Sequence, residues 1–167
     1  QPLDAARRAL EIAREAGVAT VFNPAPAVPL PDGFLGLCDY VTPNESEAAT
    51  ITGLKVETVE EARAAAERLR ELGAGAAVLT LGEKGALFHD GTVSELVPAF
   101  KVGEVRDTTG AGDAFNGGFA TALAEGRAPL DAVRFACATA SLSVTKLGTA
   151  PAMPTRAEID ALLSADA

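Results

Sequence analysis

The first half of the chain alternates between helical and extended hydrophobic patterns. Alanine and leucine recur every three to four residues, a spacing typical of amphipathic helices, over residues 5–16 and 62–72. Short apolar runs of the kind that form buried strands occupy residues 18–22, 39–42 and 76–81. Such alternation is typical of parallel strands that are connected through helices.

The second half predicts a hairpin and then helices. Two extended runs flank the turn pair Asp90-Gly91, which is typical of a β-hairpin. Three helices follow, the last one marked by the capping box Thr155-x-x-Glu158: residues 113–125, about 130–147, and from 155 onward. We therefore expect an α/β fold, with a mainly parallel sheet, helices on both faces and an antiparallel hairpin edge, in a single domain over residues 1–167.

Composition narrows the class of protein. A net charge of −9 and a pI near 4.6 argue against nucleic acid or an anionic membrane as a general partner. No apolar run approaches the length of a transmembrane helix. Cys38 and Cys137 lie in apolar contexts, so we expect buried, reduced thiols. Because no signal peptide is recognisable either, we expect a cytoplasmic protein.

One loop carries the strongest chemical signal. The tripeptide Gly110-Ala111-Gly112 is followed at once by Asp113, where a helix is predicted to begin. Glycines let backbone N–H groups approach an anion closely, and a helix start adds positive potential. A carboxylate there would repel a phosphate that is only bound. It suits a general base that takes the proton of a hydroxyl attacking a transferred phosphoryl group.

Two common nucleotide-binding motifs do not fit this loop. A dinucleotide-binding fingerprint would need glycine where Phe115 stands, and a P-loop would need a Gly-Lys-Ser/Thr string that the chain lacks. The alternative is a plain tight turn, with Asp113 only favouring the helix dipole. That alternative explains the glycines but not their position beside Asp113.

Five segments, in order, resemble the signatures of the ribokinase-like (PfkB) family of carbohydrate and nucleoside kinases. The resemblance runs over essentially the whole chain, is nearest to the ribokinase branch through Asn23-Pro24-Ala25-Pro26, and implies the family's three-layer α/β sandwich. The matching segments are residues 21–27, 42–48, 80–85, 107–119 and 144–151.

The resemblance implies an ATP-dependent carbohydrate kinase that transfers the γ-phosphate to a sugar hydroxyl. It favours D-ribose, giving D-ribose 5-phosphate. Fructokinase, 2-keto-3-deoxygluconate kinase and nucleoside kinase activities remain alternatives, as does a truncated, non-catalytic nucleotide-binding module. The family's sugar-binding N-terminal half and β-lid have no counterpart here. We therefore expect the C-terminal, nucleotide-binding portion of a longer protein that forms a homodimer, and no sugar kinase turnover by the isolated chain.

The family's catalytic and nucleotide positions carry over onto matching residues. Asp113 is the candidate base, and Gly110, Ala111 and Gly112 are the candidate anion hole for the γ-phosphate. Contacts with ATP are implied at Asn44, Glu47, Thr80, Leu81, Gly82, Glu83, Lys84, Gly85, Gly112, Asp113 and Cys137. Cys137 occupies the position that contacts adenine in relatives.

For two of these groups, the sequence gives a reason for ligand binding that does not depend on the resemblance. Asn44 and Glu47 lie three apart and share one helix face, which suits a hydrated Mg²⁺ held through few protein ligands. The alternative is an N-cap asparagine with a solvated glutamate. Residues 80–85 follow a buried strand, where ligands of open α/β sheets gather. Within them, Lys84 is equally well explained as a solvated charge.

A monovalent cation is the last implied ligand. Family members hold it mostly through backbone carbonyls, and weakly hydrated K⁺ suits such a cage with one carboxylate. Ala152 stands where a hydroxyl residue is often the ligand. The matching positions are Asp107, Thr109, Ser143, Lys146, Gly148 and Ala152.

Overall fold

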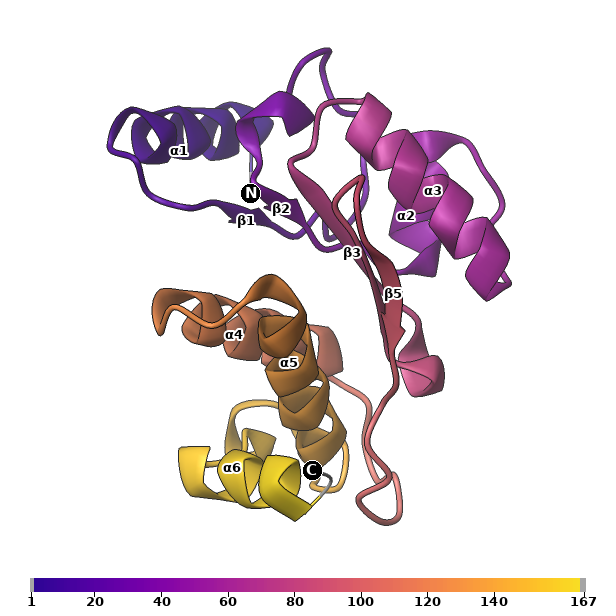
Figure 1. Cartoon of the computed structure of the whole chain (residues 1–167), viewed down its shortest axis with the longest axis vertical. Coiled ribbons are helices and arrows are strands. Elements are labelled where there is room, and N and C mark those ends of the chain that lie inside the picture. The colour runs from indigo at the N-terminus through magenta and orange to yellow at the C-terminus, as the bar shows by residue number, and fades with distance from the viewer. Residues whose placement is uncertain (1, 166–167) are drawn as a thin grey trace. The chain divides into compact units, whose positions relative to one another are not determined.

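The computed structural model describes residues 2–165, shown in Figure 1. The chain divides into two compact units. The first comprises Gln1–Leu81 and Leu87–Leu96, and the second comprises Gly82–Ala86 and Val97–Ala167. Gln1 and residues 166–167 lie outside the described residues, and the single domain expected over residues 1–167 stays a prediction.

The described residues form one five-stranded sheet in which the strands follow the order of the sequence. Its strands are β1 (Val21–Phe22), β2 (Tyr40–Val41), β3 (Ala76–Thr80), β4 (Ala86–His89) and β5 (Ser94–Val97). β2 pairs in parallel with both β1 and β3, and Tyr40 stands opposite Val21 on one side and Ala76 on the other. Only four residues join β4 to β5, too few for a parallel crossover, so these two strands run antiparallel. The predicted α/β fold is confirmed.

Three helices belong to the first unit: α1 (Leu3–Glu15), α2 (Glu45–Thr52) and α3 (Val59–Glu71). α3 begins at a second capping box in the sequence, Thr58-x-x-Glu61. The Glu61 N–H donates to Thr58 Oγ1 at 3.1 Å, and the Thr58 N–H donates to Glu61 Oε2 at 2.9 Å. α2 and α3 pack on each other and on β3 (Figure 1). This packing holds the C-terminal end of β3 in place, and with it Thr80.

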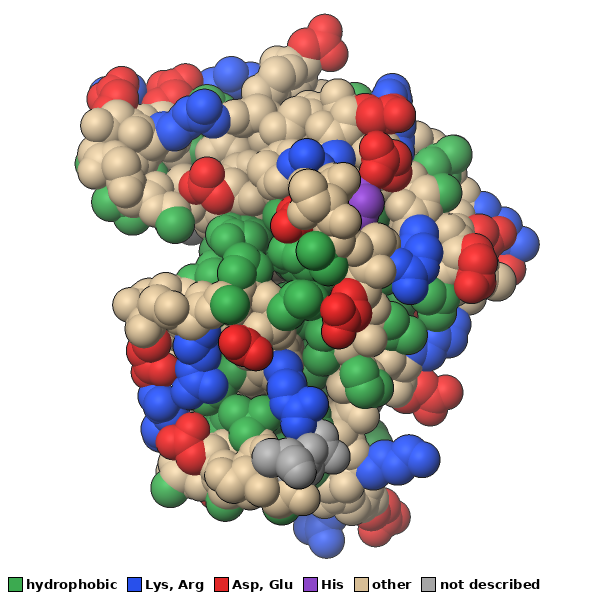
Figure 2. All heavy atoms as spheres, viewed as in Figure 1, with side chains coloured by type: hydrophobic (Ala, Val, Ile, Leu, Met, Phe, Trp, Pro, Cys, Tyr) green, Lys and Arg blue, Asp and Glu red, His purple; other side chains and the backbone are tan. Residues whose placement is uncertain are grey.

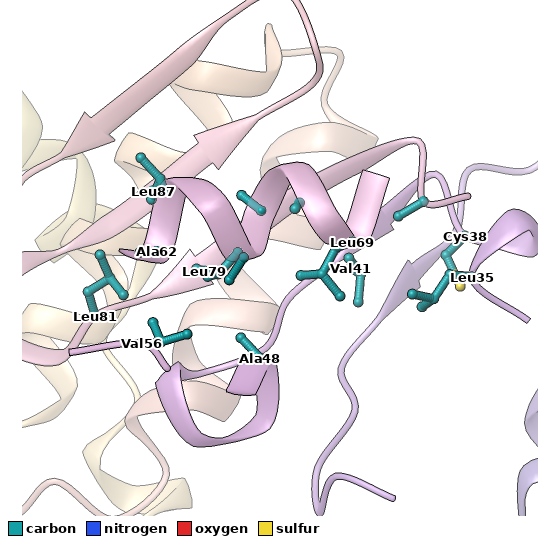
Figure 3. Packing of buried hydrophobic residues seen from close by; sticks show 14 of the residues in the cluster. Leu35, Cys38, Val41, Ala48, Val56, Ala62, Leu69, Leu79, Leu81 and Leu87 are labelled. Carbon is teal, nitrogen blue, oxygen red and sulfur yellow. The ribbon is translucent and has the colours of Figure 1, made fainter. Parts of the chain in front are cut away.

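The core of the first unit is aliphatic and small. Leu69 and Ala62 of α3 are fully buried, as is Leu79 of β3, and Figure 3 shows these side chains in one layer between helix and strand. Cys38 is 2% exposed and free, which confirms the expected buried thiol. Alanines on α3 let the helix approach the sheet closely, so the spacing of helix and strand depends on small side chains.

The first strand is shorter than the sequence predicts. The apolar run over residues 18–22 predicts a buried strand, but only Val21 and Phe22 form β1, both half-buried, and Val18 is 58% exposed. β1 stands at the end of the described strand order and has one neighbour, β2. The Thr20 N–H donates instead to the Asp39 carboxylate at 2.8 Å. β1 pairs over two residues with the equally short β2, so only part of the apolar run enters the sheet.

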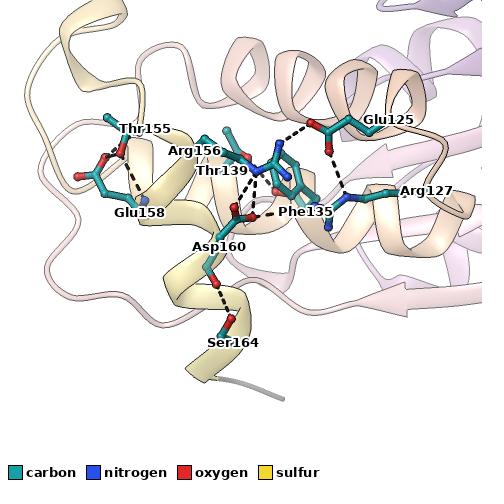
Figure 4. Close-up of polar contacts among 9 residues, drawn as sticks. All are labelled: Glu125, Arg127, Phe135, Thr139, Thr155, Arg156, Glu158, Asp160 and Ser164. Carbon is teal, nitrogen blue, oxygen red and sulfur yellow. Dashed lines mark hydrogen bonds and ion pairs between the residues drawn. The ribbon is translucent and has the colours of Figure 1, made fainter.

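The second unit contains the helices α4 (Ala111–Ala124), α5 (Pro129–Ser143) and α6 (Arg156–Ala165). α4 packs tightly along α5, and α6 packs against α5. Figure 4 shows the polar contacts at α6, where Arg156 binds Asp160 at 2.8 Å and also pairs with Glu125. The Arg127 guanidinium lies 4.7 Å from the centre of the Phe135 ring. The pair Arg156–Glu125 joins α6 to the C-terminal end of α4.

α5 ends earlier than predicted, at Ser143 rather than near residue 147. The carbonyl of Val144 accepts hydrogen bonds from the N–H groups of Arg106 and Asp107, at 2.8 and 3.2 Å. These partners come from a loop almost forty residues earlier in the chain. They turn the segment of residues 144–149 toward that loop instead of continuing the helix.

Close packing of α4 and α5 gives a matched pair of glycine substitutions. A Cβ on Gly118 would lie 2.7 Å from Thr139 Oγ1, whereas Gly117 has nothing within 4 Å. We expect Gly118→Ala to lower the free energy of unfolding by about 1–3 kcal/mol through overpacking. Gly117→Ala should raise it by about 0.5–1 kcal/mol, because alanine favours the helix. Urea unfolding of both variants measures the difference, and equal effects would contradict this account of the interface.

The surface carries both signs of charge. Basic and acidic side chains are interspersed over the face shown in Figure 2. Within residues 2–165, no helix has the length and apolar character needed to cross a membrane.

Candidate active site

The glycine-rich loop of the second unit leads directly into α4. Gly110 is the N-cap residue, with φ 79° in the left-handed region that favours glycine, and Ala111 begins the helix. The Ala114 N–H donates to the Gly110 carbonyl at 2.9 Å, which is the first helical bond. The N–H groups before Ala114 belong to the first turn, where a helix offers no carbonyl partners. The Ala111 N–H already donates to the Thr108 carbonyl at 3.1 Å, whereas those further along the turn can face an anion, which the helix dipole favours at this point.

Asp113 lies in this first turn and is exposed, while the two residues that follow it are buried. Phe115 stacks on Phe119 with ring centres 6.3 Å apart, and this anchors the turn that carries Asp113. The Asn116 side-chain amide donates to the Gly112 carbonyl at 3.0 Å. Asn116, which the sequence does not single out, therefore braces the first turn. The result is an accessible carboxylate on a fixed backbone beside the anion-binding turn.

Asp107 joins the loop to the segment of residues 144–149. Its Oδ1 accepts the Thr109 N–H and its Oδ2 accepts the Gly148 N–H, both at 2.9 Å. Hydrogen bonds from the Thr109 side chain and backbone, and from the Gly148 backbone, lower the pKa of Asp107 below its usual range. The carboxylate is therefore ionised at neutral pH, and this clamp is lost only on acidification.

Thr149 packs directly behind the loop of residues 106–112, which carries the candidate anion hole and is called the anion loop. A Cβ on Gly110 would lie 3.1 Å from the Thr149 methyl carbon. Glycine at position 110 is therefore needed both for its left-handed backbone and for this close approach. Thr149 is not in the predicted set of site residues, and no local pattern marks it.

The predicted cation positions surround the Asp107 clamp along the chain. Asp107, Thr109 and Gly148 are joined by the hydrogen bonds just described. Ser143 ends α5 and Ala152 ends the short helix η3 (Ala150–Ala152); the two are 4% and 1% exposed. Among residues 2–165, no group of three or more His, Cys, Asp or Glu side chains is placed to hold a metal ion. A cation here would be held by backbone carbonyls.

Asp107 fits such a cation. The Thr109 side chain and backbone and the Gly148 backbone donate three hydrogen bonds to this carboxylate, which offers about four acceptor sites. One carboxylate among carbonyls is a donor set of hard oxygens. The assignment of K⁺ to these residues stays a prediction.

The loop after β3 divides between the two units. Thr80 and Leu81 belong to the first, and Leu81 is 4% exposed within its core, so only its backbone can contact a nucleotide. Residues 82–85 belong to the second, where Gly82, Glu83 and Lys84 form an exposed turn of 3₁₀ helix, η2. Gly85 is buried with φ 104°. A Cβ there would lie 2.0 Å from the Val97 carbonyl oxygen.

Asn44 and Glu47 form a complete capping box at the start of α2. The Glu47 N–H donates to Asn44 Oδ1 at 2.9 Å, and the Asn44 N–H donates to Glu47 Oε2 at 2.8 Å. Asn44 is thus an N-cap residue, and Glu47 is not merely a solvated glutamate. The same contacts hold the Glu47 carboxylate in a fixed place, with Oε1 outside the capping box. Asn44 also bridges to Thr80, so these two predicted nucleotide positions lie together.

Cys137 lies in the interior of the second unit. It is 4% exposed, and its thiol donates to the Val97 carbonyl at 3.8 Å. Burial raises the pKa of this thiol to about 12, so it is neutral and unreactive at physiological pH. Both cysteines are therefore buried, free thiols. Contact of Cys137 with adenine stays a prediction.

The structure combines a parallel α/β sheet, a glycine-rich anion loop and a carboxylate in the next helical turn. Together these features indicate the class of protein to which the chain belongs. The profile of the pfkB family carbohydrate kinases matches residues 1–156, and the chain belongs to this family.

The relatives found include ribokinases. The ribokinase of Haemophilus influenzae is 43% identical over 157 residues, which cover 94% of this chain and 51% of that protein. The crystal structure of Thermotoga maritima ribokinase has a TM-score of 0.82 at 41% identity, over 93% of this chain and 52% of its own. Arabidopsis thaliana ribokinase, solved with ribose and ATP, has a TM-score of 0.88 at 33% identity, over 92% and 50%. The chain therefore spans about half the length of the relatives that it matches.

Proposed function

We propose that the full-length protein containing this chain is an ATP-dependent sugar kinase, with D-ribose as its acceptor. The observation that carries the proposal is the exposed Asp113 in the first turn of α4, directly after the left-handed Gly110. Family membership and similarity to ribokinases support the choice of reaction and of sugar.

In the proposed reaction, an oxygen of the sugar attacks the γ-phosphorus of ATP. A new bond forms between this oxygen and phosphorus, and the bond from phosphorus to the β–γ bridging oxygen breaks, giving ADP. The hydroxyl proton moves to the Asp113 carboxylate. Backbone N–H groups of the turn at positions 110–112 stabilise the negative charge on the transferred group, with Gly110 and Gly112 foremost because the Ala111 N–H donates to the Thr108 carbonyl at 3.1 Å. Because this backbone is fixed before substrate binds, little reorganisation is needed.

Two further groups complete the proposal. Asn44 and Glu47 would hold hydrated Mg²⁺, which neutralises phosphate charge when it is bound. The exposed turn at Gly82, Glu83 and Lys84 would contact the nucleotide. The proposal also includes location in the cytoplasm and a homodimer.

The test is ADP release by the full-length gene product with a panel of sugars. D-Ribose is expected to give the highest kcat/KM, ahead of D-fructose, 2-keto-3-deoxygluconate and nucleosides. A higher kcat/KM with one of those acceptors would replace ribose in the proposal. ATP binding with no ADP release from any acceptor would favour the non-catalytic nucleotide-binding module.

Potassium is expected to activate the protein more than sodium does. A cation beside Asp107 would order the clamp between Thr109 and Gly148, and with it the anion loop. ADP release and ATP affinity are measured at equal ionic strength in potassium, sodium and tetramethylammonium salts. Asp107→Asn should raise the potassium concentration needed for half-activation. Equal activity in all three salts would contradict a cation role for these residues.

A further inference from the structure

The carboxylate of Glu158 connects α6 to the segment of residues 144–149. Its Oε2 accepts the Thr155 N–H at 2.6 Å and the Thr155 hydroxyl at 2.9 Å, the contacts drawn in Figure 4. Its Oε1 accepts the ammonium of Lys146 at 3.0 Å. One side chain therefore caps a helix with one oxygen and holds a neighbouring segment with the other.

Lys146 lies, along the chain, between the two residues of that segment that hydrogen-bond to the anion loop. On one side, the Val144 carbonyl accepts the N–H groups of Arg106 and Asp107. On the other, the Gly148 N–H donates to Asp107 at 2.9 Å. Any loosening at position 146 therefore acts on both attachments.

We propose that Glu158 is a positioning residue for the anion loop, acting through Lys146 and the segment of residues 144–149. The family model matches residues 1–156, and Glu158 lies just outside that match. The kinetic consequence rests on the proposed kinase function, whereas the coupling between α6 and the loop does not.

The effect is modest, because both partners are on the surface. The Lys146 and Glu158 side chains are each 42% exposed, and exposed ion pairs are weak. Breaking the pair is expected to speed exchange of the Thr109 and Gly148 amide hydrogens by about two- to fivefold, the range in which such pairs act. The same factor is expected for the loss in kcat, with the KM for sugar unchanged.

Two variants separate coupling from capping. Glu158→Gln keeps a residue that completes a capping box but removes the charge that holds Lys146. Lys146→Met removes the ammonium and leaves the backbone carbonyl in place. Glu71→Gln is the matched control, because it breaks an ion pair of similar exposure, with Arg68 at 2.7 Å, in the first unit.

Hydrogen exchange is measured on the full-length gene product without nucleotide, together with steady-state kinetics. Faster exchange at Thr109 and Gly148 in both single variants, no further change in the double variant, and no change in Glu71→Gln would support the proposal. Unchanged exchange at these amides in Glu158→Gln would overturn it, as would equal changes in the control. If exchange responds but no variant or parent phosphorylates a sugar, the coupling stands and the proposed kinase function fails.

Discussion

Asp113→Asn is expected to reduce kcat of the full-length gene product by about 10²–10⁴-fold, the usual contribution of a general base. The amide keeps the shape of the side chain but has no basic oxygen for the hydroxyl proton. Affinity for ATP should change little, because the N–H groups of the first turn of α4 remain in place. Steady-state kinetics and equilibrium nucleotide binding measure the two quantities separately.

Asp131→Asn is the matched control for this substitution. Asp131 is also an acidic residue in the first turn of a helix, α5 of the same unit, so the variant makes the same chemical change at an equivalent helix position. The control should retain its kcat. If the Asp113 variant kept more than about a tenth of the parent kcat, below the range of a general base, the assignment would be wrong.

Gly85→Ala is expected to have the largest effect on stability. The new methyl carbon would lie 2.0 Å from the Val97 carbonyl oxygen and 2.7 Å from the Ala99 nitrogen, both of which are backbone atoms that cannot turn aside. Overpacking costs about 1–3 kcal/mol, occasionally more. A left-handed backbone adds about 1–2 kcal/mol for any residue with a Cβ. Together these give a loss of about 2–5 kcal/mol in the free energy of unfolding.

Gly82→Ala separates the two causes. Gly82 also has a positive φ, 56°, but nothing lies within 4 Å of the position of its Cβ. This variant should lose only the backbone contribution, about 1–2 kcal/mol. Urea unfolding of the two variants gives the comparison. If Gly85→Ala were no worse than Gly82→Ala, the close approach to Val97 would not limit stability.

Features that depend on neighbouring residues were predictable from the sequence. Thr58 and Glu61 marked the start of α3, and Gly110 marked the turn before Asp113, because capping and left-handed turns need particular side chains at fixed offsets. The alternation of helices and strands likewise gave the α/β fold, because it depends on the local hydrophobic period.

Features that depend on distant partners were not predictable in this way. The early end of α5 follows from hydrogen bonds between Val144 and Arg106, and no residue near 144 signals a break. Thr149 gains its place from a contact with Gly110 that spans almost forty positions. β1 comprises only Val21 and Phe22, which pair with Tyr40 and Val41 almost twenty positions away. A single sequence carries no periodic signal for such contacts.

The hydrogen bonds of the Asp107 clamp determine which substitutions are tolerated at positions 107, 109 and 148. Two of the clamp's bonds run from one side chain to backbone N–H groups, and every residue except proline supplies such a group. The Thr109 side chain donates a further hydrogen bond to the same carboxylate. Substitution at position 109 therefore keeps the backbone bonds but loses the side-chain bond, while position 107 must supply the carboxylate. Position 148 is held by its φ of 85° rather than by the bond. A saturation mutagenesis profile should show strict selection at 107, glycine at 148 for conformational reasons, and a preference for threonine or serine at 109 with other residues tolerated.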